Sequence, residues 1–226
     1  MSESDWLFCS NPQEMLSFLR DRGASERKGR LFATACGRRV SHLLVPEARE
    51  ALGVAERYAD GLAGPADRKR AREAAFLVGW VSDPSTAHRR GPAKAAVSEA
   101  LQASGWQAAD GTARRLGYAG ALDLYSQNGL DWNAALALSS ANLVNILRDI
   151  FGNPFAPISF SPSWRTEAVV SLASGIYEER LSERMGVLGD ALEEAGCDDC
   201  TVLEHCRAAG PHQKGCWVVD LVLGKT

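Results

Sequence analysis

The chain has 226 residues, of which 46% are hydrophobic and 23% charged, and its formal net charge is −3. This length can form one sizeable core or two small helical domains, and the composition is ordinary for a soluble protein. There is no run of about 18 apolar residues, as a membrane span needs, and no secretory signal in the start MSESDWLFCSNPQEM. We therefore expect a cytoplasmic protein without membrane contact, whose six cysteines are thiols, metal ligands or buried side chains rather than disulfides.

Helical periodicity and matching end signals predict an all-α protein. The first clear helix has Asn11 as its N-cap and Pro12 as its first residue, and it stops at Gly23. Further helices are expected after Ser25, from Pro46 to Leu62, over ADRKRAREAAFLVGWVSD, and at about 93–103, 110–127 and 132–150. The stretch PSTAHRRGPAK is predicted to be a loop because of its Pro, Ser and Gly content. No segment shows strong period-two alternation, so strands are not expected.

The segment NILRDIFGNPFAPISFSPSW interrupts the helical pattern, because its prolines cannot continue a helix. Aromatic side chains spaced along it favour an ordered connection over a plain linker. Beyond it, apolar residues recur at helical spacing from Val169 to Leu192. We therefore predict three parts: a multi-helix bundle body over 1–150, an aromatic and proline-rich connection over 151–163, and a C-terminal helical unit over 164–226 with a Cys/His-rich end.

Charge is unevenly spread along the chain. Residues 1–115 hold 18 Lys and Arg against 14 Asp and Glu, whereas residues 116–226 hold 7 against 14. The basic clusters are interrupted by acids or glycines, which is typical of solvated helix faces and disfavours nucleic acid as a partner. The opposite charges of the two halves favour contact with protein, including head-to-tail contact between chains.

The segment CDDCTVLEHCRAAGPHQKGCW, residues 197–217, holds four of the six cysteines and two of the four histidines. One interpretation is a structural zinc site, with Cys197, Cys206, His212 and Cys216 as ligands, because all four lie near helix ends and turns where they can converge. A second is a small core of buried thiols and histidines, since cysteine is among the most buried residue types. Under both, this segment must either bind a metal or dock closely onto the helices before it, because alone it cannot bury enough apolar surface.

A third interpretation is a thiol enzyme. Cys216 would be the nucleophile at a helix N-terminus, where the helix dipole lowers a thiol pKa. His212 or His205 would be the base, and Asp220 or Asp198 would orient it. No P-loop, dinucleotide-binding, HExxH or GxSxG motif accompanies this arrangement.

Several segments resemble a family of bacterial helical proteins that is expanded in planctomycetes. They are DWLFCSNPQEMLSFLRDR, SERKGRLFATACGRR, RDIFGNPFAP, LGDALEEAGC and HCRAAGPHQKGCWVVDLVLGK, and together they span about Asp5 to Lys225. The resemblance implies no particular activity. The sequence departs from the family pattern at Gly37, Ser41 and Cys200, and the last departure argues against an essential site built on Cys200.

The function predicted from these observations is a non-enzymatic, protein-binding or regulatory helical module, with zinc as the one candidate cofactor. The alternatives are a Cys/His thiol hydrolase and a zinc-stabilised nucleic-acid-binding protein.

Overall fold

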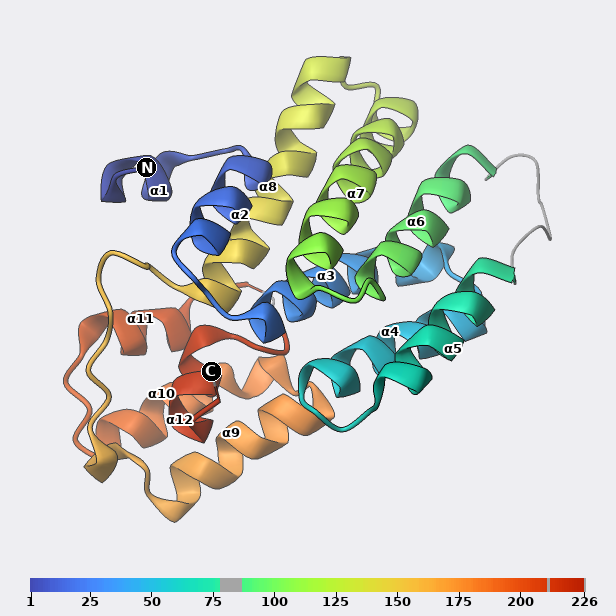
Figure 1. The fold of residues 1–226 in the computed structure, drawn as a ribbon. Coiled ribbons are helices and arrows are strands. Elements are labelled where there is room, and N and C mark those ends of the chain that lie inside the picture. Colours follow the sequence, from blue (N-terminus) through green and yellow to red (C-terminus); the bar gives the residue numbers. More distant parts are fainter. Residues whose placement is uncertain (78–86, 211, 226) are drawn as a thin grey trace. The chain divides into compact units, whose positions relative to one another are not determined.

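The computed structural model describes residues 1–77, 87–210 and 212–225 (Figure 1). Over these residues the chain forms twelve α-helices and no strand, which confirms the predicted all-α fold class. The chain divides into two compact units, Met1–Leu147 and Arg148–Thr226, here called the N-terminal and C-terminal units. This division falls close to the predicted boundary at residue 150, and the predicted connection over 151–163 belongs to the C-terminal unit.

The N-terminal unit is a bundle arranged around one helix. Its helices are α1 (Glu3–Phe8), α2 (Pro12–Asp21), α3 (Glu26–Arg39), α4 (Pro46–Ala59), α5 (Pro65–Leu77), α6 (Ala87–Ala100), α7 (Gly105–Asn128) and most of α8 (Trp132–Phe151). Helix α3 packs against α4, α6 and α7. Alanines form most of the core cluster between these helices, and their small side chains let the helix backbones approach closely.

Some helix starts in this unit follow the sequence signals, but α1 was not predicted and α7 begins at Gly105, five residues before the expected start at about 110. The side-chain oxygen of Asn11 accepts hydrogen bonds from the backbone N–H groups of residues 13 and 14 at 3.1 and 3.4 Å, so it caps α2 as predicted. The loop expected over 84–94 is wrong from Ala87 onward, because α6 begins there and contains Pro92. Ala93 and Val97 of this helix are fully buried, so their packing outweighs the cost of the proline. The end of the preceding predicted helix, 78–83, lies outside the described residues.

The C-terminal unit holds four further α-helices after the end of α8: α9 (Glu167–Glu179), α10 (Met185–Glu194), α11 (Cys200–Arg207) and α12 (Trp217–Leu223). Helix α9 packs against α10 and α12, and α10 packs against α11. Val169, Leu188, Val202 and Val218, one from each helix, are fully buried in a single apolar cluster. The Cys/His-rich segment is therefore docked onto the helices before it. Close docking was one of the two alternatives predicted for this segment, the other being a bound metal ion.

One described helix, α8, is long and apolar enough to cross a membrane by length and composition, with a mean hydropathy of 1.2 over 18 residues. Part of that window, 39%, is buried inside the protein. A single helix of this kind is weak support for a membrane span, because core helices of soluble proteins pass the same test.

The crossing of α3 and α7 gives a stability prediction. A Cβ on Gly105 would collide with the backbone carbonyl of Glu26, which cannot move without shifting the start of α3. We expect Gly105→Ala to lower the free energy of unfolding by about 3 kcal/mol. Gly91→Ala is the matched control in the same unit, because nothing lies within 4 Å of the added methyl group. Urea denaturation of both variants measures this, and equal stabilities would contradict the close approach.

Candidate metal centre

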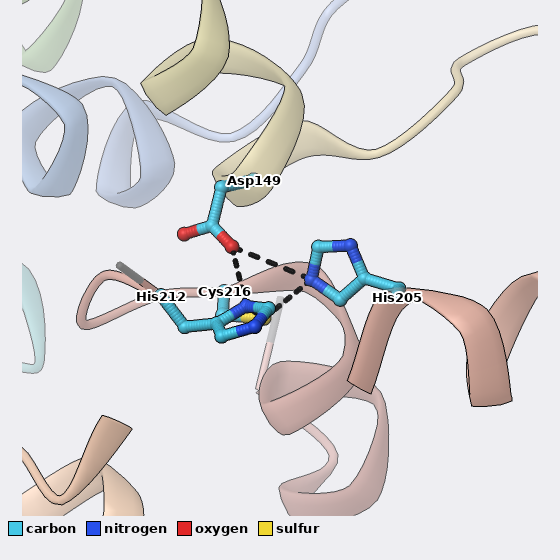
Figure 2. A group of neighbouring side chains, drawn as sticks. All are labelled: Asp149, His205, His212 and Cys216. Carbon is cyan, nitrogen blue, oxygen red and sulfur yellow. Dashed lines mark hydrogen bonds and ion pairs between the residues drawn. The ribbon is translucent and has the colours of Figure 1, made fainter. Parts of the chain in front are cut away.

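Four polar side chains of the C-terminal unit come together from three separate segments (Figure 2). Asp149 lies in the last turn of α8, which ends because Gly152 adopts a left-handed conformation with φ of +66°. His205 lies in the last turn of α11, whose first turn is capped by Asp199. His212 belongs to the loop between α11 and α12, and Cys216 is the N-cap residue of α12.

The loop before α12 is shaped by a tight turn. The backbone N–H of Cys216 donates to the carbonyl of Gln213 at 2.9 Å, and Gly215 within this turn has a φ of +93°. A residue with a side chain rarely adopts this conformation, so glycine is required there. The turn sets His212 and Cys216 on the same side of the loop, facing Asp149 (Figure 2).

One donor atom from each of the four side chains faces a common point. The Nδ1 atom of His212 lies 3.0 Å from Oδ1 of Asp149 and 3.9 Å from Sγ of Cys216. The Nε2 atom of His205 lies 3.3 Å from the same Oδ1 and 3.1 Å from the same Sγ. All four donor atoms lie within 4.8 Å of one another.

These separations suit a four-coordinate ion. Bonds of about 2.0–2.3 Å from a tetrahedral zinc ion to N, O and S ligands place the ligand atoms about 3.3–3.8 Å apart. Four of the six separations, 3.0 to 3.9 Å, scatter around that range, and the other two are no longer than 4.8 Å. The set could therefore hold a metal ion with small adjustments of side-chain torsion angles.

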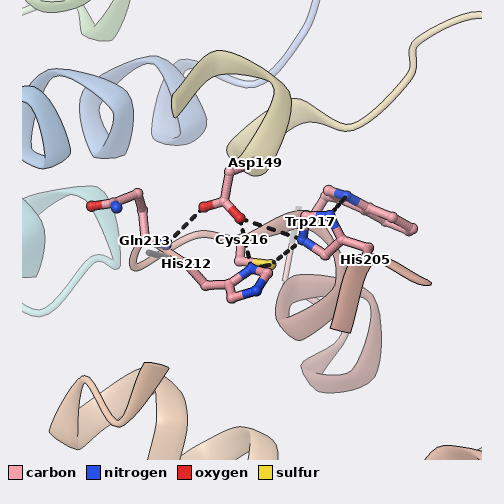
Figure 3. A network of polar contacts seen from close by, with 6 residues as sticks. All are labelled: Asp149, His205, His212, Gln213, Cys216 and Trp217. Atoms are coloured by element: carbon pink, nitrogen blue, oxygen red, sulfur yellow. Dashed lines mark hydrogen bonds and ion pairs between the residues drawn. The ribbon is translucent and has the colours of Figure 1, made fainter. Parts of the chain in front are cut away.

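Two further residues complete the network (Figure 3). The backbone N–H of Gln213 donates to Oδ2 of Asp149 at 2.7 Å, so both carboxylate oxygens have partners. The indole N–H of Trp217 donates to Nδ1 of His205 at 3.1 Å, and the two rings pack with centroids 4.9 Å apart. Each of these contacts fixes the orientation of a side chain whose other atom faces the common point.

Burial shapes the acid–base properties of the cluster. Burial raises the pKa of Asp149, but the hydrogen bonds from His205, His212 and the Gln213 N–H outweigh it, so the net pKa lies below its ordinary value and the group is a carboxylate. Burial, followed by the nearby Asp149 charge, raises the pKa of the Cys216 thiol well above its ordinary value. Without a metal ion, Cys216 is therefore a neutral thiol at pH 7.

The geometry does not match a thiol enzyme. In a catalytic triad the histidine uses one nitrogen for the nucleophile and the other for the carboxylate. Here Nε2 of His205 faces both Cys216 and Asp149. Nδ1 of His212 likewise faces both residues. The thiol of Cys216 is also fully buried and has a raised pKa. The four donor atoms therefore lie around a common point, as metal ligands do. They do not form the series of nucleophile, histidine and carboxylate that a catalytic triad requires.

The structure brings together two of the four metal ligands predicted from the sequence, His212 and Cys216. Cys197 and Cys206, the other two, lie in the apolar core of the same unit with 3% and 2% exposure. Burial, followed by the neighbouring Cys197, raises the pKa of Cys206 to about 12, as expected for a buried thiol. His205, which was not among the ligands predicted from the sequence, takes a place among the four.

Asp149 is the residue that sequence reasoning missed. Asp220 and Asp198 were the predicted orienting acids, but Asp220 is buried on α12 outside the group of four and Asp198 is exposed. Asp149 lies far from the other three in sequence and looks like a surface residue on a helix. One feature of the sequence could have indicated Asp149. It lies one turn before Gly152, which ends the helix, inside the segment RDIFGNPFAP.

The burial of Cys216 predicts its reactivity. With a chelator present at neutral pH, iodoacetamide should label the exposed Cys200 readily and leave Cys216 unmodified until the protein unfolds. Peptide mapping by mass spectrometry after timed labelling measures each site. Labelling of Cys216 as fast as Cys200 would contradict the neutral, buried thiol and favour a reactive nucleophile.

Comparison with known proteins adds no further constraint on this centre. No protein-family model, curated protein or solved structure matches the chain.

Proposed function

We propose that the C-terminal unit binds one divalent transition-metal ion, zinc in the first place, through Asp149, His205, His212 and Cys216. The observation that carries this proposal is the convergence of one donor atom from each side chain on a common point, with each histidine presenting one nitrogen to both Cys216 and Asp149. In a hydrogen-bond relay the histidine links its two partners through different ring nitrogens, whereas metal ligands each direct one donor atom at the ion.

The donor set favours zinc over harder or softer ions. One thiolate, two imidazoles and one carboxylate form a mixed sulfur, nitrogen and oxygen set, which suits a borderline ion and disfavours calcium or magnesium. All four coordination positions of a tetrahedral ion would be filled by the protein. A closed shell of this kind supports a structural or regulatory ion and disfavours one that activates water for hydrolysis.

The chain's proposed kinship with the bacterial helical family is consistent with this assignment. That resemblance rests in part on the segments RDIFGNPFAP and HCRAAGPHQKGCWVVDLVLGK. Asp149 lies in the first of these segments, and His205, His212 and Cys216 lie in the second.

We further propose that the whole protein is a non-enzymatic, cytoplasmic helical module that binds other proteins. Nucleic acid is disfavoured because arginines of the basic half are paired with acids, as in Arg27 with Asp60 and Arg38 with Glu56. Large apolar side chains on α7 and α8 support a protein partner, since Tyr118 and Leu138 are 54% and 47% exposed. Steeply salt-dependent retention on immobilised DNA would count against this assignment.

Metal analysis tests the central proposal. Protein purified without a histidine tag should carry about one zinc per chain, or bind one on titration. Asp149→Asn and Cys216→Ser should each weaken zinc binding by more than about 100-fold, beyond the 10- to 100-fold loss usual for a residue that only orients a ligand.

Cys206→Ser is the matched control, because Cys206 is a buried thiol of the same core that lies outside the group of four. It should destabilise the unit while leaving the zinc stoichiometry unchanged. Loss of zinc from Cys206→Ser, with Asp149→Asn still binding normally, would instead support the ligand set predicted from sequence spacing.

The raised pKa of Cys216 gives a pH prediction. Because the thiol is protonated before binding and a thiolate afterwards, zinc binding should release about one proton. Affinity should therefore rise about tenfold per pH unit between about pH 7.5 and 8.5, above the ordinary titration range of histidine. Isothermal titration calorimetry in buffers of different ionisation enthalpy measures the proton count. An affinity that does not change with pH would show that Cys216 is not a ligand.

A further inference from the structure

The hydrogen bond from Trp217 fixes the tautomer of His205. An indole N–H can only donate, so Nδ1 of His205 must accept it and carries no proton. In the neutral ring the proton therefore sits on Nε2. This nitrogen points at Sγ of Cys216 and Oδ1 of Asp149, at 3.1 and 3.3 Å.

Hydrogen bonds alone can therefore satisfy the cluster when no ion is bound. Asp149 accepts from the backbone N–H of Gln213 and from the facing nitrogens of His205 and His212. The surrounding helices have their own apolar core, which includes Cys216 and Trp217. The unit therefore has an apolar core of its own as a source of stability, in contrast to small zinc fingers, which are unfolded without their ion.

Coordination of an ion by Nε2 of His205 changes this hydrogen-bond pattern. An ion held by Nε2 would need the lone pair of that nitrogen, so the single proton of the neutral ring would lie on Nδ1. Nδ1–H and the indole N–H of Trp217 would then be two donors facing each other. Their hydrogen bond would be lost, and the indole ring would have to shift.

Trp217 is placed to transmit that shift to the end of α8. A Cβ on Gly152 would lie 3.1–3.4 Å from three atoms of the indole ring, so the ring rests directly on the backbone of Gly152. Gly152 follows the last residue of α8 and begins the connection into the rest of the unit. A moving indole therefore acts on the backbone at the point where α8 ends.

We infer that the centre is a metal-responsive switch, in which binding of an exchangeable zinc ion breaks the Trp217–His205 hydrogen bond and moves Trp217 while the fold persists. This inference rests on the proposed function, since it requires zinc to bind these four side chains. It goes further in assigning the ion a regulatory role rather than a purely structural one, and in naming Trp217 as the residue that responds.

The test uses the full chain labelled with ¹⁵N and titrated with zinc chloride after chelator treatment. The chain has six tryptophans, and the indole N–H signal of Trp217 is identified by its absence in Trp217→Phe. Zinc should shift this signal strongly, while far-UV circular dichroism shows the same helicity with and without the ion. Trp217→Phe keeps an aromatic ring at this position but removes the donor, so it should bind zinc about fivefold more tightly, as expected from losing a hydrogen bond that opposes binding.

Trp164→Phe is the matched control, because its indole N–H donates to the carbonyl of Gly196 at 3.1 Å, away from the four donors. Its zinc affinity should equal that of the unchanged protein. Zinc binding with an unmoved Trp217 signal, or loss of helicity on chelation, would overturn the switch and leave a structural ion. Absence of zinc binding at any concentration that preserves the fold would overturn the proposed function itself.

Discussion

The largely buried carboxylate of Asp149, with 11% of its side chain exposed, is the constraint on which the arrangement of the C-terminal unit depends. A charge removed from water is costly unless hydrogen-bond donors surround it. Here the donors come from α11 and from the loop before α12, far along the chain from α8. Satisfying this one group therefore holds the end of α8, the end of α11 and the loop in fixed positions. The depressed pKa of Asp149 shows that these donors more than offset the effect of burial.

Cys216 belongs both to this polar cluster and to the apolar core of the unit. Its sulfur faces the two histidines, while the residue itself is fully buried among the side chains of α9 to α12. The apolar core packs α9 to α12 against one another, and the polar cluster ties the end of α8 to α11 and to the loop before α12. A core of this kind is absent from small domains that depend on a metal ion to fold. Cys206 lies in the same core but outside the cluster, so its substitution removes a buried thiol without removing a donor atom of the cluster.

The directions of the histidine contacts, more than their distances, distinguish a metal centre from a thiol enzyme. The contacts between Cys216, the histidines and Asp149 are close enough for a thiol enzyme as well as for a metal centre. The choice of nitrogen distinguishes them, because each histidine offers the same atom to both partners, and the burial of the Cys216 thiol points the same way. The second nitrogen of His205 faces the indole of Trp217, which cannot serve as the carboxylate of a triad.

The sequence alone determined the helical class, the cap at Asn11 and the density of thiol and imidazole groups in residues 197–217, because periodicity, capping and composition are local properties. It also indicated His212 and Cys216, which lie on either side of a short turn. It misjudged residues 87–94, where packing of Ala93 and Val97 overrode the proline signal. Only the tertiary structure brought in Asp149 and left Cys197 and Cys206 in the core. Which face of α11 points inward, and which distant helix end meets it, is decided by the packing of whole helices, and a ligand set drawn from several segments follows from that packing.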